Sequence, residues 1–186
     1  MPKAITIGLQ AALVLATMGH VVQAYRIHVL GRQIHELTRA HTLQVGETVP
    51  PLTSLTLDGE LVTIVGDRPP RPVIVYWMSP DCSWCVRNEA NFRAVVAAAR
   101  AEYDVVAVSA RSDGLAAFVR GSAPPYTVVE PPMPEAIASY KFAATPMTMV
   151  IGRDRRVTQV WNGVYDGENR AEVEAFFRTS LPGLLR

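Results

Sequence analysis

Two cysteines, Cys82 and Cys85, are the only ones in the 186-residue chain, and two residues separate them. A pair at this C-x-x-C spacing can alternate between a dithiol and a disulfide. The reacting species in that exchange is a thiolate, which attacks a disulfide sulfur. The spacing therefore predicts thiol–disulfide chemistry. The redox group would be the Cys82–Cys85 disulfide itself, with no metal or organic cofactor.

Two other roles for the cysteines remain open at this point. A zinc site needs about four ligands, but all four histidines lie between positions 20 and 41, far along the chain from the cysteines. A purely structural disulfide would close a very short loop and would add little stability. A redox-active pair fits the pattern better than either alternative, so we expect no metal site.

The cysteine pair lies between two predicted elements. Residues 73–77 are β-branched and aromatic and predict a buried strand. Residues 86–103 are rich in Ala, Arg and Glu and predict a helix, and Ser79-Pro80-Asp81 separates the two. The first turn of a helix has unpaired N–H groups and the positive end of the dipole, which favour a thiolate. We therefore expect Cys82 to be the exposed nucleophile and Cys85 the more buried resolving thiol.

The rest of the chain after residue 43 predicts an α/β domain. Upstream of the cysteines, residues 52–57 and 60–65 flank Asp58-Gly59, which is typical of a β-hairpin. Alternation of strands and helices implies a mostly parallel sheet covered by helices on both faces, and the last two strands add an antiparallel hairpin. The pattern predicts strands at 105–108, 126–129, 147–151 and 157–161, and helices at 113–120 (capped by Ser112), 135–142 and 168–181.

The N-terminal segment, residues 4–25, contains no Asp, Glu, Lys or Arg. It is long enough for a membrane span, which needs about 20 residues, and would contact the lipid bilayer. A signal peptide cleaved after Val22-Gln23-Ala24 and a buried soluble helix are the alternatives. Residues 26–41 have apolar positions at helical spacing and predict an amphipathic stalk. We therefore divide the chain into an anchor and stalk, 1–42, and a globular domain, 43–186.

Charge gives little information about partners or orientation. The net charge is +1, which offers no argument for nucleic-acid binding. Only Lys3 precedes the predicted span, whereas Arg26, Arg32 and Arg39 follow it. This small count favours a cytoplasmic location for the domain.

These features together resemble a known family. The order of elements, the C-x-x-C at the first strand-to-helix turn and a Thr-Pro before the late strand are similar to the thioredoxin fold, over residues 43 to 181. Residues 45–51, Val-Gly-Glu-Thr-Val-Pro-Pro, resemble the start of the redoxin branch. That branch includes membrane-anchored TlpA and ResA type proteins and the MauD-like accessory proteins, which the predicted anchor and stalk resemble most. The resemblance implies a bacterial inner-membrane protein with a periplasmic domain, in conflict with the charge count.

The resemblance also implies roles for individual residues. Cys82 matches the attacking cysteine and Cys85 the resolving one. Pro146 matches the cis-proline beside the sulfurs, and the Thr145 backbone would pair with an extended substrate segment. Trp84 would add an apolar docking surface beside Cys82, while Trp77 is expected in the core.

The chain departs from the family at two positions. Thioredoxin's buried aspartate corresponds to Tyr76, and the glutamate of TlpA and ResA type proteins corresponds to Asn88. The next residue, Glu89, is either a proton-transfer group or an ordinary solvated helix carboxylate. Asp81, next to Cys82, would disfavour the thiolate by like-charge repulsion.

The sequence thus predicts a membrane-anchored thiol–disulfide oxidoreductase. Its partners would be a client protein with thiols or a disulfide and a membrane-associated thiol donor or acceptor. A non-catalytic assembly factor, binding client segments through the same domain, is the alternative. A peroxiredoxin is disfavoured because Val75, four residues before Ser79, is not the proline that such an enzyme requires.

Overall fold

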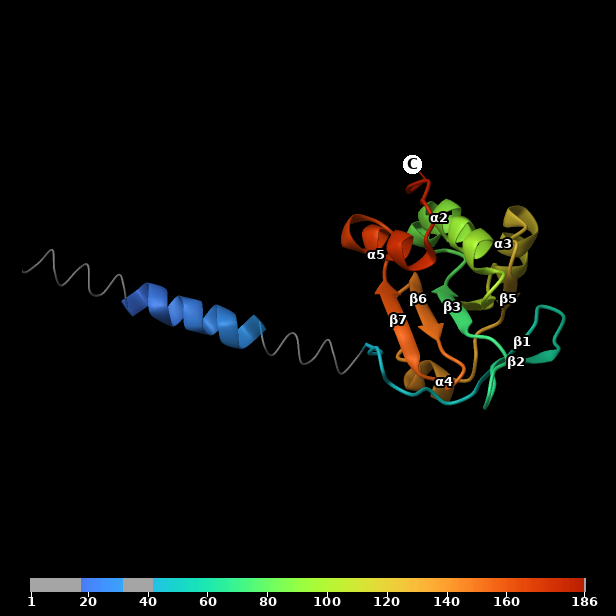
Figure 1. The fold of residues 1–186 in the computed structure, drawn as a ribbon, viewed down its shortest axis with the longest axis horizontal. Helices are drawn as coiled ribbons and strands as arrows, with labels where there is room; N and C mark the ends of the chain where they lie inside the picture. The colour runs from blue at the N-terminus through green and yellow to red at the C-terminus, as the bar shows by residue number, and fades with distance from the viewer. Residues whose placement is uncertain (1–17, 32–41, 186) are drawn as a thin grey trace, which may run out of the picture. The chain divides into compact units, whose positions relative to one another are not determined.

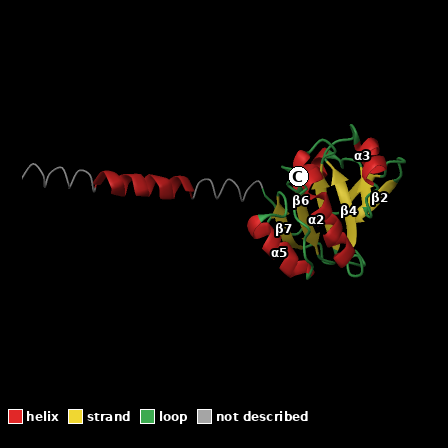
Figure 2. Ribbon diagram, turned by 90° about the horizontal axis from the view of Figure 1, so that it is seen from above, coloured by secondary structure: helices red, strands yellow, loops and turns green. Residues whose placement is uncertain are grey.

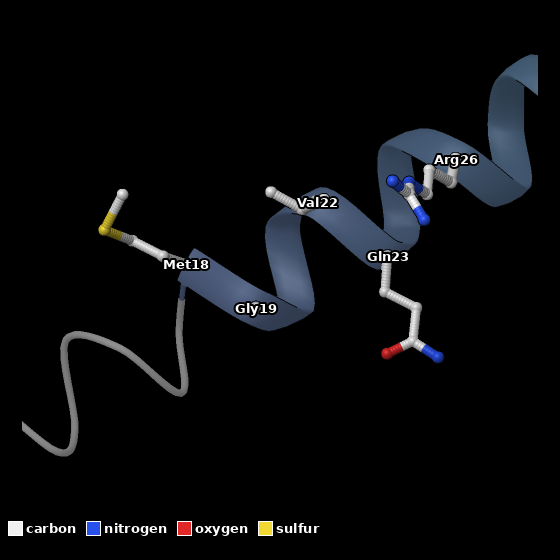
Figure 3. Close-up of a pocket in the computed structure, with 5 residues that line it drawn as sticks. All are labelled: Met18, Gly19, Val22, Gln23 and Arg26. Carbon is white, nitrogen blue, oxygen red and sulfur yellow. The ribbon is translucent and has the colours of Figure 1, made fainter.

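The computed structural model describes residues 18–31 and 42–185. The chain forms two units, Met1–His41 and Thr42–Arg186. In the first unit, residues 18–31 form a helix. Figure 3 shows that the Val22 and Gln23 side chains point in different directions from this helix. Among the described residues, no helix is both long and apolar enough to cross a membrane. Residues 4–17 of the predicted span and 32–41 of the predicted stalk lie outside the described residues.

The described part of the second unit contains a five-stranded sheet in the order β5-β4-β3-β6-β7 (Figure 1). β3 pairs with β4, and β4 with β5, in parallel, whereas β3–β6 and β6–β7 are antiparallel. A separate antiparallel hairpin precedes the sheet, as predicted. The strands are β1 (Leu52–Leu55), β2 (Leu61–Val65), β3 (Val73–Met78), β4 (Asp104–Ser109), β5 (Thr127–Val129), β6 (Met147–Ile151) and β7 (Val157–Asn162).

The sheet mixes parallel and antiparallel pairs, as predicted, but it is not mostly parallel, because β6 lies antiparallel to the central strand β3. The connection from β5 to β6 passes from one edge of the sheet, across β4 and β3, to the other side of β3. After this connection, β6 runs in the direction opposite to β3, β4 and β5. A buried apolar strand has the same composition in either direction, so the sequence pattern does not reveal this reversal.

β3 is buried along its whole length and directs alternate side chains to two core layers. Ile74, Tyr76 and Met78 face α2 (Ser83–Ala99), α3 (Leu115–Ser122) and α5 (Gly167–Phe177). The other three, Val73, Val75 and Trp77, face the layer that contains the hairpin and α4 (Pro134–Ser139). Both faces of the sheet are therefore covered, as predicted, and Figure 2 shows α2 and α5 together on one of them.

Several helix boundaries differ from the predicted ones. α2 begins at Ser83 rather than Val86, because Cys82 itself is the N-cap. Ser112 does not cap α3; the helix begins after Gly114, whose φ of 79° is easily reached only by a residue without a Cβ atom. α4 ends before Lys141, which has a positive φ, and α5 ends at Phe177, where the left-handed Arg178 is the C-cap.

Candidate functional site

The two sulfurs are placed by the first turn of α2. Cys82 has an extended backbone, and its Sγ accepts a hydrogen bond from the Cys85 backbone N–H at 3.1 Å. This bond satisfies one of the N–H groups that every helix start leaves unpaired. Both cysteines are free thiols; Cys82 is partly exposed, whereas Cys85 is only 3% exposed. The two sulfurs thus differ in access, as the sequence predicted.

Burial also affects the acidity of the Cys85 thiol. Burial first, and then the hydrogen bond and charge of Cys82, raise the pKa of the Cys85 thiol to about 12, although the Ser79 backbone and the Thr145 side chain act in the opposite direction. Cys85 therefore stays protonated at neutral pH in the dithiol form. This state suits a resolving thiol, which reacts only after its neighbour has formed a bond with a partner.

The Thr145-Pro146 peptide bond is cis, as predicted for this position. It directly precedes β6 and places the Thr145 carbonyl 3.6 Å from Cys82 Sγ, which donates to it. The next carbonyl, that of Pro146, accepts from the Gly163 N–H at 2.8 Å and so fixes this turn to the end of β7. The structure thus brings the cysteine pair together with the Thr-Pro turn, although Thr145 is 63 residues from Cys82 in the sequence.

The two tryptophans near the motif have different surroundings. Trp84 is 49% exposed, and the Arg87 guanidinium lies 4.7 Å from the centre of its ring. Trp77 is buried and stacks on Phe142 with ring centres 4.2 Å apart. Trp84 is therefore available at the surface next to Cys82, whereas Trp77 is a core residue, as expected.

Glu89 is not a solvated carboxylate, because its side chain is only 14% exposed. Arg93 Nε lies 2.8 Å from one of its oxygens, and the Tyr126 hydroxyl donates to the other at 2.9 Å. Burial and the charge of Glu89 raise the pKa of Tyr126, so that hydroxyl remains a donor. Among the described residues, no hydrogen bond joins Glu89 to either cysteine. Its role in proton transfer stays a prediction.

Asp81 is compensated by partners that the sequence analysis did not identify. The Ser79 hydroxyl donates to one oxygen, and Arg111 Nη1 lies 2.5 Å from the other. The Ser79 hydrogen bond and then Arg111 hold the pKa of Asp81 below its usual value. Arg111 Nη2 also lies 3.6 Å from Asp113 Oδ2. Because Arg111 is 30 residues from Asp81, only its position after β4 could have suggested this pairing.

Tyr76 and Asn88, at the two departures from the family pattern, are both buried. The Tyr76 ring stacks on Phe92 with a centre-to-centre distance of 3.9 Å. Asn88 Oδ1 accepts from the Tyr165 backbone N–H at 3.0 Å and from the Asn91 amide at 3.3 Å. In the described part of the chain, no three His, Cys, Asp or Glu side chains are grouped as metal ligands would be.

Comparisons with known proteins find likeness only among solved structures. No protein-family model matches the chain, and no curated protein matches it. The thioredoxin domain of a thiol-disulfide oxidoreductase from Bacteroides vulgatus matches with a TM-score of 0.60 and 17% identity, over 73% of this chain and 99% of that one. A thiol:disulfide interchange protein named DsbE, from Chlorobium tepidum, matches with a TM-score of 0.61 and 21% identity, over 74% and 95%.

A peroxiredoxin-like protein from Aquifex aeolicus also matches, with a TM-score of 0.59 and 18% identity, over 74% of this chain and 87% of that one. At these identities the likeness establishes the fold, and the chain has the thioredoxin fold that its sequence resembles. Because proteins named for different activities match about equally well, the fold does not choose among them. The residues at the site must do so.

Proposed function

We propose that this protein is a thiol–disulfide oxidoreductase that exchanges the Cys82–Cys85 disulfide with partner proteins. The observation that carries the proposal is the arrangement of the two sulfurs. Cys82 Sγ is accessible at the N-terminus of α2 and faces the Thr145 carbonyl, while Cys85 is buried one turn further along. A peroxidase would need only one reactive cysteine and a preceding proline, which Val75 replaces.

In the reductive direction, the Cys82 thiolate attacks one sulfur of a partner disulfide. A mixed disulfide forms, and the other partner sulfur leaves and takes up a proton. Cys85 then loses its proton and attacks Cys82 Sγ, which breaks the mixed disulfide and forms the Cys82–Cys85 bond. The second partner sulfur leaves as a thiol, so the partner gains two electrons and two protons and the cysteine pair loses them. The oxidative direction reverses these steps.

The partner would dock as an extended segment beside the Thr145 backbone, with Trp84 as an apolar contact. The apolar residues 4–25 and the resemblance to TlpA, ResA and MauD-like proteins support an anchor in a bacterial inner membrane, with the domain on the periplasmic side. A client enzyme under maturation, together with a membrane-associated thiol protein that renews the pair, would supply the two partners.

The proposal predicts that Cys85→Ser, in the full-length chain, accumulates mixed disulfides with partner proteins, because the resolving thiol is gone. Cys82→Ser is the matched control, since it keeps one cysteine but lacks the accessible nucleophile. The measurement is non-reducing electrophoresis of the protein isolated from cells after acid quenching. Equal amounts of adduct in the two variants, or none in either, would contradict the proposal.

A non-catalytic assembly factor is the second candidate. The exposed Trp84 side chain favours it, because a binding surface of this kind does not depend on the sulfurs. A Cys82→Ser, Cys85→Ser double variant that keeps full function in cells would support the assembly factor. Complete loss of function, with the double variant still folded, would support the oxidoreductase.

A further inference from the structure

The segment that follows α5 returns to α2 and is hydrogen-bonded to it (Figure 1). The Leu185 backbone N–H donates to the Arg87 carbonyl at 2.8 Å, and Arg87 Nε donates to the Leu185 carbonyl at 3.1 Å. About one helical turn further along, the Gly183 N–H donates to Asn91 Oδ1 at 2.8 Å. These bonds attach the tail to α2 and fix the position of the Arg87 side chain.

Arg87 lies between this tail and Trp84. Its guanidinium carbon is 4.7 Å from the centre of the indole ring, which is within the range of a cation–π contact. Residues three apart share one face of a helix, so Trp84 and Arg87 point to the same side of α2. Trp84 is 49% exposed and Leu185 is 47% exposed. We call these three residues, which combine two exposed apolar side chains with one guanidinium, the docking strip.

The Arg87 guanidinium has no carboxylate partner among the residues that the structure describes. Its Nε group binds a neutral backbone carbonyl, and its two Nη groups make no hydrogen bond to another described residue. Arg93, further along α2, instead pairs with Glu89. Because the strongest hydrogen bonds of arginine are those to a carboxylate, Arg87 can still bind a carboxylate from another molecule.

The docking strip starts close to the nucleophile. Trp84 is in the first turn of α2, and Arg87 follows Cys82 by five residues, which is about 7–8 Å along the helix axis. An extended segment spans about 3.3 Å per residue, so a side chain two or three residues from a partner's cysteine can reach Arg87. Asp81, the acidic residue next to Cys82, is paired with Arg111 and therefore does not cancel the charge of Arg87.

Resting on the proposed function, we propose that the docking strip selects partner segments with an Asp or Glu two or three residues from the reactive cysteine. Arg87 binds this carboxylate through its Nη groups, and Trp84 and Leu185 contact apolar side chains of the same segment. The chemical steps are unchanged: the partner disulfide gains two electrons and two protons, and the cysteine pair loses them. A charge at the rim of a site mainly alters the rate of association, so Arg87 affects partner choice and not the reduction potential.

The test uses the full-length reduced protein and two disulfide-linked peptide dimers that differ only in Asp or Asn two positions after the cysteine. Acid quenching and chromatography give the second-order rate constant for reduction of each dimer. The same ratio measured with dithiothreitol corrects for the intrinsic reactivity of the peptides. After this correction, the wild type should reduce the Asp dimer about two- to fivefold faster at low ionic strength, and high salt should remove most of the difference.

Arg87→Gln should abolish the preference for the Asp dimer, because it removes the charge that the carboxylate binds. Its rate constant with the Asn dimer and its reduction potential should equal those of the wild type. Arg87→Lys keeps the charge and should retain part of the preference, although it lacks the planar fork of arginine. Arg120→Gln is the matched control, since it changes the net charge equally at an exposed position of α3, and it should keep the full preference.

Three outcomes would overturn the inference. The wild type could reduce the two dimers at the same corrected rate, or Arg87→Gln could keep the wild-type preference. Arg87→Gln could also slow both dimers equally and lower the thermal unfolding midpoint, which would show that Arg87 only holds the tail and Trp84 in place. A wild-type chain that reduces neither dimer and forms no Cys82–Cys85 disulfide would contradict the proposed function itself, and the inference with it.

Discussion

At the level of single residues, the two sulfurs differ through what surrounds them. Cys82 is exposed enough to meet a partner and lies beside the Thr145 carbonyl, whereas Cys85 is enclosed by core side chains. Asp81, the charged residue next to Cys82, is neutralised by Arg111. The local charge at the nucleophile is thus set by a side chain from the loop after β4.

Arg111→Ala should therefore slow the alkylation of Cys82 by neutral iodoacetamide, about two- to fivefold at low ionic strength. The uncompensated Asp81 charge disfavours a neighbouring thiolate, and salt should remove most of the difference because both side chains are solvent-exposed. Arg120→Ala, which removes an exposed arginine of α3, is the control. Equal rates for Arg111→Ala and the wild type at low salt would contradict this view of the site.

At the level of elements, the start of α2 connects the fold to the chemistry. The Cys82 side chain is the N-cap, so the nucleophile also stabilises the helix that positions Cys85. A cap lost on substitution by Ala typically costs about 0.5–2 kcal/mol, whereas Ser is among the preferred capping residues.

Cys82→Ala should therefore be less stable than Cys82→Ser by about 1 kcal/mol. The measurement is urea-induced unfolding of both variants under reducing conditions. Both variants lack the nucleophile, so each serves as the control for the other. Identical midpoints and slopes would show that the Cys82 side chain does not act as a cap.

The sequence was sufficient to predict most elements, because strands such as 73–77 and 147–151 are short apolar runs between clear turn residues. The site was predictable where its residues share a motif, as Cys82 and Cys85 do, or a resemblance, as the Thr-Pro turn does. Strand direction and the pairing of Asp81 with Arg111 depend on contacts between distant segments. Local pattern contains no information about such contacts.

At the level of the whole molecule, the oxidation state of the pair should set how stability responds to pH. Burial raises the pKa of Cys85 to about 12 in the folded dithiol form, above its ordinary value of 9.0. The unfolded chain therefore releases this proton first as the pH rises. The contribution of the protonated Cys85 thiol to the free energy of unfolding is therefore complete below pH 9, and it is lost between pH 9 and about 12. The disulfide form has no such proton.

The reduced protein should therefore lose stability relative to the oxidised protein above pH 9, by roughly 1–3 kcal/mol at pH 10–11. Buried tyrosines such as Tyr165 titrate in both oxidation states, so their contributions cancel in the comparison. Denaturant unfolding of the two forms from pH 7 to pH 11 measures the difference. A difference that stays constant with pH would contradict a buried, protonated Cys85.

The reduction potential of the Cys82–Cys85 pair, in the full-length protein, is the most direct test of the central claim. Equilibration with a glutathione or dithiothreitol series, followed by acid trapping of free thiols, measures it. A redox-active pair should titrate reversibly with two electrons at a potential between about −270 and −120 mV, the range of exchange proteins. A value below about −300 mV would instead indicate a structural disulfide, and failure to form a disulfide would exclude exchange by this pair.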